Sequence, residues 1–148
     1  MKAIKKDEAK LWCENHRFQL SEHGLPAWHD SEDLEDFVIP PDAGARVALV
    51  REHMNALKEE EELCVWLDDW DVWQSGQRWH IFERFLASYG IGDAINEKPA
   101  YLVPTKDFDI ALSVVTFAVL MLADCHVLGS SGRVYLFYSH DEIGHKRA

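Results

Sequence analysis

The sequence has few basic residues. Its 148 residues include 15 Lys and Arg but 26 Asp and Glu, which gives a formal net charge of −11. Binding to nucleic acid needs Lys and Arg on the phosphates, and docking on anionic lipid needs the same charges. We therefore expect no nucleic-acid partner and no membrane partner. A basic protein is the more suitable partner, because an acidic surface attracts it.

Cysteines and long apolar runs are also scarce. Cys13, Cys64 and Cys125 are far apart and form no CxxC pair, so no disulfide framework is expected and the thiols fit a reducing cytoplasm. The first residues lead into no apolar segment typical of a secretory signal. The most apolar run, residues 112–123, is well short of the ~20 residues of a membrane helix. These absences predict a cytoplasmic protein.

Common catalytic and cofactor motifs are missing. The sequence contains no GxGxxG, P-loop, HExxH or GxSxG pattern. Cys13, His16, His23 and His29 follow the spacing C-x2-H-x6-H-x5-H, but only the first pair has the tight spacing that zinc sites use. We therefore expect neither a metal nor a cofactor.

The remaining composition is typical of one globular domain. Hydrophobic residues make up 47% of the chain, and six residues are tryptophan, which is enough for a packed core. We expect a single domain over residues 1–148. Residues 1–40 either pack on this domain or form a helical or irregular N-terminal extension.

Apolar spacing and capping residues predict three helices. Residues 5–18 are amphipathic, and Asp42 is a good N-cap for a second helix that ends in the acidic run 59–62. Ser75 is placed to cap a third helix that Gly90 ends, with Ile81 widening its apolar face. The apolar stripe expected on the second helix is Ala43, Val47, Val50, Met54 and Leu57.

The second half of the chain predicts a loop, a buried helix and a hairpin. Residues 91–104 are expected to be a loop or short extended segment, and Thr105 to cap a buried helix. Residues 125–128 and 133–139 are expected to form a β-hairpin with Leu128 opposite Arg133. Alternation then gives a core face of Cys125, Val127, Val134, Leu136 and Tyr138.

Together these elements predict an α+β fold. Two to three helices would pack on a small, mainly antiparallel sheet that ends in the C-terminal β-hairpin. An edge strand is expected at residues 37–39, because Pro40 and Pro41 follow it.

Polar residues gather at the end of the hairpin. The candidate catalytic residues are Asp124, His126, Ser139, His140, Asp141 and Glu142. In the predicted register Asp141 lies about 13 Å along the sheet beyond the partner of Asp124, too far for a shared metal. Three consecutive residues of a strand also cannot form a Ser-His-Asp relay. We therefore favour a structural role, in which Ser and Asp satisfy backbone groups of a turn.

A second group mixes aspartates with tryptophans after the strand at 63–67. Clustered carboxylates can bind a cation or serve as acid and base, as in glycosidases, where aromatic rings stack on sugars. The simpler interpretation is a solvated strand end with the tryptophans in the core. The candidate binding residues are Trp66, Asp68, Asp69, Trp70, Asp71, Trp73 and Ser75.

Residues 63–142 resemble a family of small, uncharacterised bacterial proteins. The shared features are Trp73-x-Ser75 at a helix start, Asp124 after a long apolar helix, and a terminal Ser-His-Asp-Glu at 139–142. Ala123 stands where the family has tryptophan. The family has no established activity to transfer. The resemblance implies a small cytoplasmic α+β protein, of the kind encoded beside bacterial toxins as immunity proteins.

Three functions are compatible with the sequence. The leading one is a non-enzymatic acidic binding protein, a toxin-immunity or antitoxin-like inhibitor that blocks a basic partner with its acidic runs 30–36, 59–62 and 68–71. In this hypothesis the tryptophans near 66–73 anchor the partner. The first alternative is a small metal-dependent or His/Asp hydrolase that uses the candidate catalytic residues. The second is a structural module that dimerises through an exposed edge strand.

Overall fold

The fold was examined in a computed structural model that describes residues 1–27, 33–68 and 77–147. The strands are β1 (Lys2–Ile4), β2 (Gln19–Leu20), β3 (Pro26–Ala27), β4 (Glu35–Val38), β5 (Glu62–Asp68), β6 (Ala100–Pro104), β7 (Asp124–Gly129), β8 (Tyr135–Tyr138) and β9 (Ile143–Arg147). The α-helices are α1 (Lys6–Asn15), α2 (Ala43–Met54), α3 (Gln77–Ala87) and α4 (Phe108–Leu120), and two 3-10 turns are η1 (Asn55–Leu57) and η2 (Thr105–Asp107).

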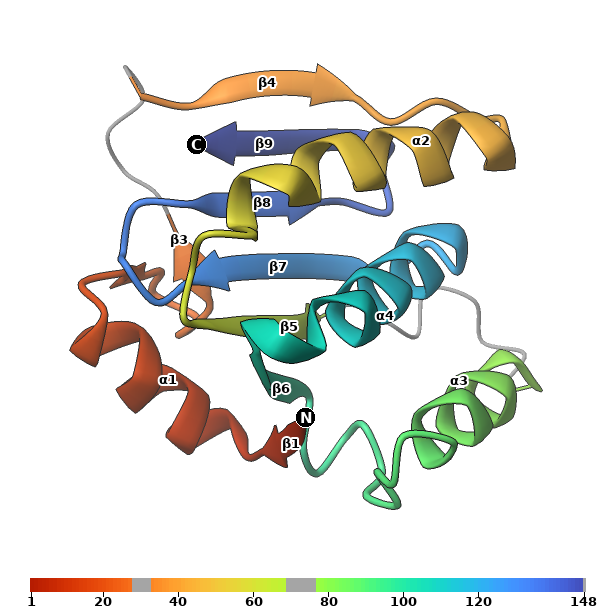
Figure 1. Cartoon of the computed structure of the whole chain (residues 1–148), viewed down its shortest axis with the longest axis horizontal. Helices are drawn as coiled ribbons and strands as arrows, with labels where there is room; N and C mark the ends of the chain where they lie inside the picture. Colours follow the sequence, from red (N-terminus) through yellow and green to blue (C-terminus); the bar gives the residue numbers. More distant parts are fainter. Residues whose placement is uncertain (28–32, 69–76, 148) are drawn as a thin grey trace.

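Seven strands form one antiparallel sheet in the order β1-β6-β5-β7-β8-β9-β4. Helices α2, α3 and α4 cover one face of this sheet, and α1 packs on the other (Figure 1). The predicted α+β class, with helices on a mainly antiparallel sheet and a C-terminal hairpin, is confirmed. The described residues contain four α-helices where two to three were expected.

The main core lies between the sheet and the three helices. Helix α4 packs on the sheet with Val114, Val115 and Ala118 fully or almost fully buried, so the predicted buried helix is present. Asp42 caps α2 as predicted, because its Oδ1 accepts a hydrogen bond from the Ala45 N–H at 2.8 Å.

The apolar stripe of α2 is only partly the predicted one. Val50, Met54 and Leu57 are fully buried, but Ala43 is exposed and Val47 is half-buried. Their expected places against the core are taken by two polar residues, Arg46 and His53, which are 6% and 7% exposed.

The first forty residues are part of the sheet and its second covering layer. Strand β1 pairs with β6, and β4 pairs with β9, so these residues supply both edges of the sheet. Helix α1 buries Trp12 against the second face, where its indole N–H donates to Glu62 at 2.9 Å. The described part of residues 1–40 is therefore paired with and packed on this sheet.

The register of the predicted hairpin differs by two residues. Leu128 pairs with Tyr135 instead of Arg133, and His126 pairs with Phe137. Strand β7 continues through Gly129 because Gly129 also pairs with Leu63 of β5, which moves the turn along the chain. A shift of two residues keeps each side chain on its face, so the predicted core face of this hairpin is confirmed.

The short extended segment expected within residues 91–104 is present as a central strand, β6. Three other local expectations are wrong. The Thr105 hydroxyl does not cap α4; it donates to the backbone carbonyl of Glu60. The acidic run 59–62 is not a helix end, because Glu60 accepts hydrogen bonds from the N–H and hydroxyl of Ser131 and Glu62 begins β5. Ile81, expected in the core, is 58% exposed.

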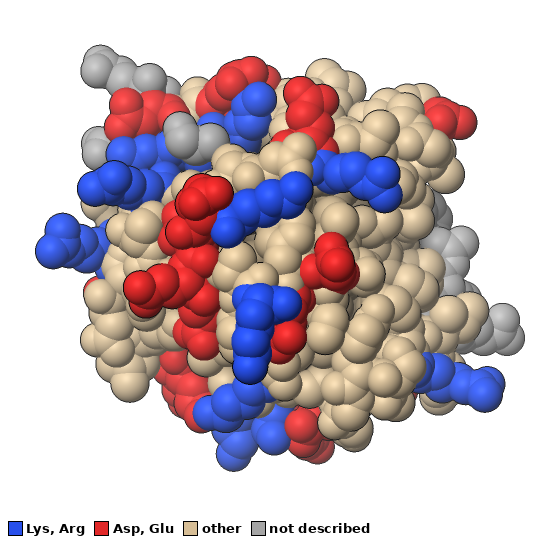
Figure 2. All heavy atoms as spheres, in the orientation of Figure 1, with Lys and Arg blue, Asp and Glu red and all other residues tan. Residues whose placement is uncertain are grey.

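Charge is unevenly spread over the face that the three helices cover. Figure 2 shows acidic and basic side chains intermingled on this face, beside a large uncharged area. Helix α4 contributes to that area because Asp109 is its single charged residue. Within the described residues, none of the helices has both the length and the apolar character needed to cross a membrane.

Candidate functional site

The two groups of candidate residues meet at one end of the sheet. Strands β5 and β7 are neighbours, and their register places Trp66 opposite His126 and Asp68 opposite Asp124. Residues directly opposite each other on paired strands point to the same face. The two groups are far apart along the chain, but the pairing of β5 with β7 brings Asp68 beside Asp124.

Residues 139–142 form the tight turn that joins β8 to β9. The N–H of Ser139 donates to Ile143 O at 2.9 Å, and the N–H of Glu142 donates back to Ser139 O at 3.1 Å. The Ser139 hydroxyl accepts from the N–H of Asp141 at 3.2 Å. Glu142 has a positive φ of 64°, as the last position of such a turn requires. Ser139 and Glu142 therefore make the backbone contacts of a turn, which is the structural role that the sequence analysis preferred to a catalytic one.

His140 folds back over Asp124. Its backbone N–H and its Nδ1 lie 2.7 Å and 2.8 Å from Asp124 Oδ1. The side chains are 26% and 14% exposed, so the contact is largely shielded from water. The predicted separation of this turn from Asp124 is wrong, because the shifted register and the turn after Tyr138 bring the two segments together.

Glu142 is held by a buried arginine. The Arg46 guanidinium contacts the Glu142 carboxylate, and it also donates to the carbonyls of Pro40 at 2.7 Å and Val119 at 3.3 Å. Three segments, the turn at 139–142, the end of α4 and the residues before α2, are thereby joined. The sequence analysis missed Arg46. The available signal was its position four residues before Val50, on the same side of the helix.

His126 is a core residue. It is 5% exposed and stacks on Phe137 with ring centroids 4.5 Å apart, and its Nδ1 lies 3.1 Å from the Tyr135 hydroxyl. Burial lowers the pKa of His126 to about 3, so the imidazole is neutral near pH 7. A role as a surface acid or base does not fit this position.

The Asp124–His140 pair is the arrangement closest to catalytic chemistry. The carboxylate orients the imidazole, as in hydrolases that use a histidine base. The hydroxyl of the neighbouring Ser139 accepts a hydrogen bond of the turn from the N–H of Asp141. Within the described residues, no three His, Cys, Asp or Glu side chains gather as ligands of a metal ion.

The candidate binding residues are placed only in part. Trp66 is 1% exposed and packs in the cluster under α1, so it is not available as a surface anchor. Asp68 is half-buried at the end of β5. Asp69, Trp70, Asp71, Trp73 and Ser75 lie outside the described residues.

Two residues of the C-x2-H-x6-H-x5-H spacing, Cys13 and His16, have environments unlike those of metal ligands. Cys13 is fully buried, and burial raises the pKa of its thiol to about 12. The Nδ1 of His16 lies 2.7 Å from the Trp12 carbonyl oxygen, and its ring stacks on the Trp12 indole. His29 lies outside the described residues.

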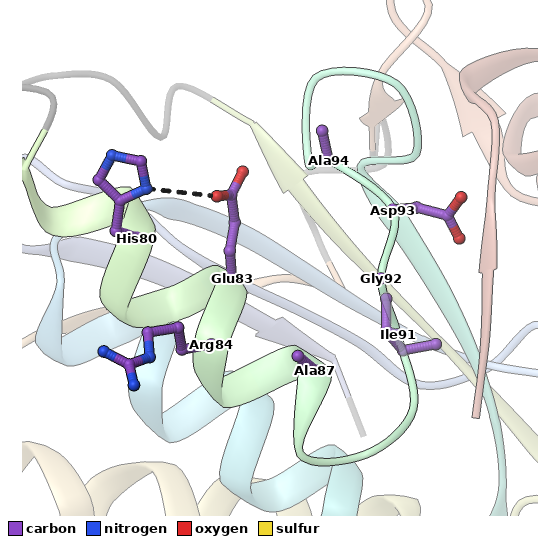
Figure 3. Close-up of a pocket in the computed structure, with 8 residues that line it drawn as sticks. All are labelled: His80, Glu83, Arg84, Ala87, Ile91, Gly92, Asp93 and Ala94. Carbon is purple, nitrogen blue, oxygen red and sulfur yellow. Dashed lines mark ion pairs between the residues drawn. The ribbon is translucent and has the colours of Figure 1, made fainter.

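A hollow of about 560 Å³ lies between α3 and the loop that follows it. His80, Glu83 and Arg84 line its helical side (Figure 3). The His80 and Glu83 side chains are 82% and 41% exposed, 3.7 Å apart. Asp93 is directed away from α3 and pairs with Lys98 at 2.9 Å. The hollow is open to water, and its polar groups do not converge on one point.

A smaller hollow of about 290 Å³ lies between α2 and the edge of the sheet formed by β8, β9 and β4. Its lining includes the buried His53, both signs of charge and the apolar Leu136. Asp33 and Glu35 of this lining belong to the acidic run 30–36 named in the sequence analysis, which missed His53. The signal available in the sequence was a histidine at a core position of an amphipathic helix.

Comparisons with protein-family models, with curated proteins and with solved structures found no match to this chain. The resemblance drawn from residues 63–142 therefore stays a prediction.

Proposed function

We propose that this protein is a non-enzymatic acidic binding protein that recognises a basic protein, in the manner of a toxin-immunity protein or an antitoxin-like inhibitor. The observation that carries the proposal is its excess of carboxylates over basic side chains, a net charge of −11. An excess of this size accelerates association with a basic partner by electrostatic steering.

Ion pairs within the fold leave this excess in place. Several basic residues already have an acidic partner, among them Arg46, Lys98, Lys146 and Arg147. Other carboxylates remain exposed, including Glu59, Glu61 and Asp141. These exposed carboxylates are the groups that would meet the basic partner.

The contacts of the candidate catalytic residues also favour binding over catalysis. His126 is neutral in the core, Ser139 accepts a turn hydrogen bond and Glu142 contacts Arg46. Each of these contacts stabilises the fold, which accounts for the residue type at that position. A binding protein would need no catalytic role for these residues.

The test is isolation and reconstitution of the complex. Tagged protein is used at low salt to capture partners from its own source cells, and a captured basic protein is then purified and titrated at several salt concentrations. We expect the affinity to fall steeply with salt, and the activity of a toxic partner to be inhibited. Capture of no basic protein, or an affinity independent of salt, would contradict the proposal.

The second candidate is a small hydrolase built on the Asp124–His140 pair, whose 2.8 Å contact orients the imidazole. Its test is hydrolysis of an ester and phosphoester panel by wild type and by His140→Ala. Turnover that disappears in the variant, while its unfolding curve stays unchanged, would favour the hydrolase.

Dimerisation through the edge strand is less well supported. Val38 on β4 is 76% exposed, but Glu35 and Asp36 lie on the same strand. Charged side chains on an edge strand disfavour its pairing with a copy. Sedimentation of a monomer would exclude this module.

A further inference from the structure

Two exposed apolar side chains lie next to each other at one edge of the sheet. Val38 of β4 and Ile143 of β9 are cross-strand partners, and they are 76% and 50% exposed. The neighbouring Phe37 packs against His53 of α2, so alternation turns Val38 toward the other face of the sheet, the one that carries α1. Figure 1 shows α1 at the opposite end of the sheet from β4. The described helices therefore leave this apolar pair uncovered.

The same edge presents backbone groups that an added strand can bond to. β4 is the last strand in the order of the sheet, and no described strand lies beyond it. The Ile39 N–H donates to Glu142 O at 2.8 Å, so the backbone groups of Ile39 point inward, toward the β9 side. In an antiparallel pair, inward and outward residues alternate along the strand. The N–H and C=O groups of Asp36 and Val38 therefore point outward, to the open edge.

Exposed carboxylates lie on both sides of the apolar pair. Asp36 is one strand step away on β4, and its Oδ1 lies 2.6 Å from His145 Nδ1. Asp141 is in the turn before β9, and its Oδ1 lies 3.5 Å from His140 Nε2. The two carboxylate side chains are 78% and 76% exposed, and among the described residues neither forms an ion pair with Lys or Arg. This arrangement is complementary to a basic occupant.

We propose that an extended segment of the basic protein partner adds as a strand to the edge of β4. An apolar side chain of the segment would pack on Val38 and Ile143, and Lys or Arg side chains would lie beside Asp36 and Asp141. Alternate residues of an extended segment point to one face, so its pattern is basic-x-apolar-x-basic. Apolar and opposite-charge pairs across strands stabilise this kind of addition. The proposal rests on the proposed function, which supplies the basic partner.

The test uses a synthetic peptide with blocked ends, of sequence Lys-Thr-Lys-Thr-Val-Thr-Lys, and follows the backbone amide signals of the full chain by NMR. We expect saturable shifts at Asp36, Val38 and Ile143. We also expect slower exchange of the Val38 amide hydrogen with water, because this N–H gains an acceptor. A peptide with Glu in place of each Lys should bind at least about tenfold more weakly. Equal binding of the two peptides, or shifts scattered over the surface without saturation, would overturn the proposal.

Methylated peptides separate strand addition from contact through side chains alone. Two versions of the lysine peptide carry N-methyl groups on alternate backbone nitrogens, one in each of the two possible frames. Both keep every side chain, but only one loses the N–H groups that face β4. We expect that version to bind at least about fivefold more weakly and the other to bind as the parent peptide does. Equal affinity of the two versions, or unchanged exchange of the Val38 amide with saturating parent peptide, would contradict strand addition.

Variants of exposed residues test the two kinds of side-chain contact. Val38→Ser should weaken the lysine peptide at least about threefold, whereas Ile81→Ser, at a position 58% exposed on α3, should leave its affinity unchanged. Asp36→Asn should weaken the peptide at least about fivefold, whereas Asp109→Asn, an exposed aspartate of α4, should have no effect. Wild-type affinity in Val38→Ser or in Asp36→Asn would refute the site.

The two proposals can fail separately. If a basic partner binds with steep salt dependence but the peptide does not saturate at β4, the edge is not the recognition point and the proposed function stands. If the peptide saturates at β4 and no basic protein is captured, the site stands and the proposed function falls.

Discussion

Replacing Arg46 with methionine tests the contact that joins three segments of the molecule. The Arg46 side chain is 7% exposed. Methionine keeps much of its buried aliphatic stem and removes the guanidinium. The variant loses the bonds to the carbonyls of Pro40 and Val119 and the contact with Glu142. The Pro40 carbonyl would then lack its donor in a region from which water is partly excluded, whereas the Val119 carbonyl would keep the Leu122 N–H at 3.3 Å.

The expected loss follows from these three contacts. A hydrogen bond contributes about 1 kcal/mol net, so the three together predict a loss of about 3 kcal/mol in the free energy of unfolding. Glu142 is 46% exposed, so its carboxylate returns to water at little cost and its share is the smallest. The midpoint of thermal unfolding should fall by roughly 6–12 °C for a chain of this size.

The assay is denaturant unfolding followed by circular dichroism, with Arg51→Met as the matched control. Arg51 is exposed on the same helix, so the same substitution there should change stability by less than about 0.5 kcal/mol. Glu142→Gln should cost less than about 1 kcal/mol, because most of the arginine's bonds remain. A loss below about 1 kcal/mol in Arg46→Met would refute the reasoning that this residue joins the three segments.

Three further predictions concern the core, the turns and the thiols. The pKa of His126 in the folded protein, about 3, lies below its unfolded value of 6.5. As the pH falls below 6.5 the unfolded chain binds a proton that the folded protein does not, so the free energy of unfolding falls by up to about 1.4 kcal/mol per pH unit. Urea unfolding at several pH values should show a weaker dependence of this free energy on pH in His126→Asn. Glu142→Gly should be about 1 kcal/mol more stable than Glu142→Ala, since both lose Arg46 but only glycine accepts a φ of 64° freely, and the opposite order would contradict the turn. Cys13, Cys64 and Cys125 are all fully buried, so Ellman's reagent should label them far more slowly in the native protein than in denaturant.

Features fixed by neighbouring residues were predictable from the sequence. Asp42 caps α2 because its side chain needs only the N–H groups of the next turn. Alternation predicted which side chains of β7 and β8 face the core. That prediction was correct although the register was wrong, because a shift of two residues leaves each side chain on the same face. The class of the fold was correct for the same reason, since each long element has its own apolar pattern.

Features fixed by distant partners were not predictable. The turn after β7 is placed by the pairing of Gly129 with β5, some sixty residues earlier in the chain. Strand β9 has the sequence IGHKR, which lacks apolar alternation, and it is held by pairing with β8 and by ion pairs to β4. The meeting of Asp124 with His140 depends on both of these, so the sequence analysis placed them too far apart.

The position of β1 and β4 at the two edges of the sheet has a consequence for biosynthesis. The ribosome makes both strands within the first forty residues, but the residues that pair with them come about a hundred positions later; Asp36 and His145 are 109 apart. The growing polypeptide therefore carries these two strands unpaired while about a hundred further residues are made. The sheet closes only after β9 has emerged, so it cannot be completed before that point of synthesis. Until then, the carboxylates of β4 give the nascent chain a charge that opposes association with its copies on the same messenger.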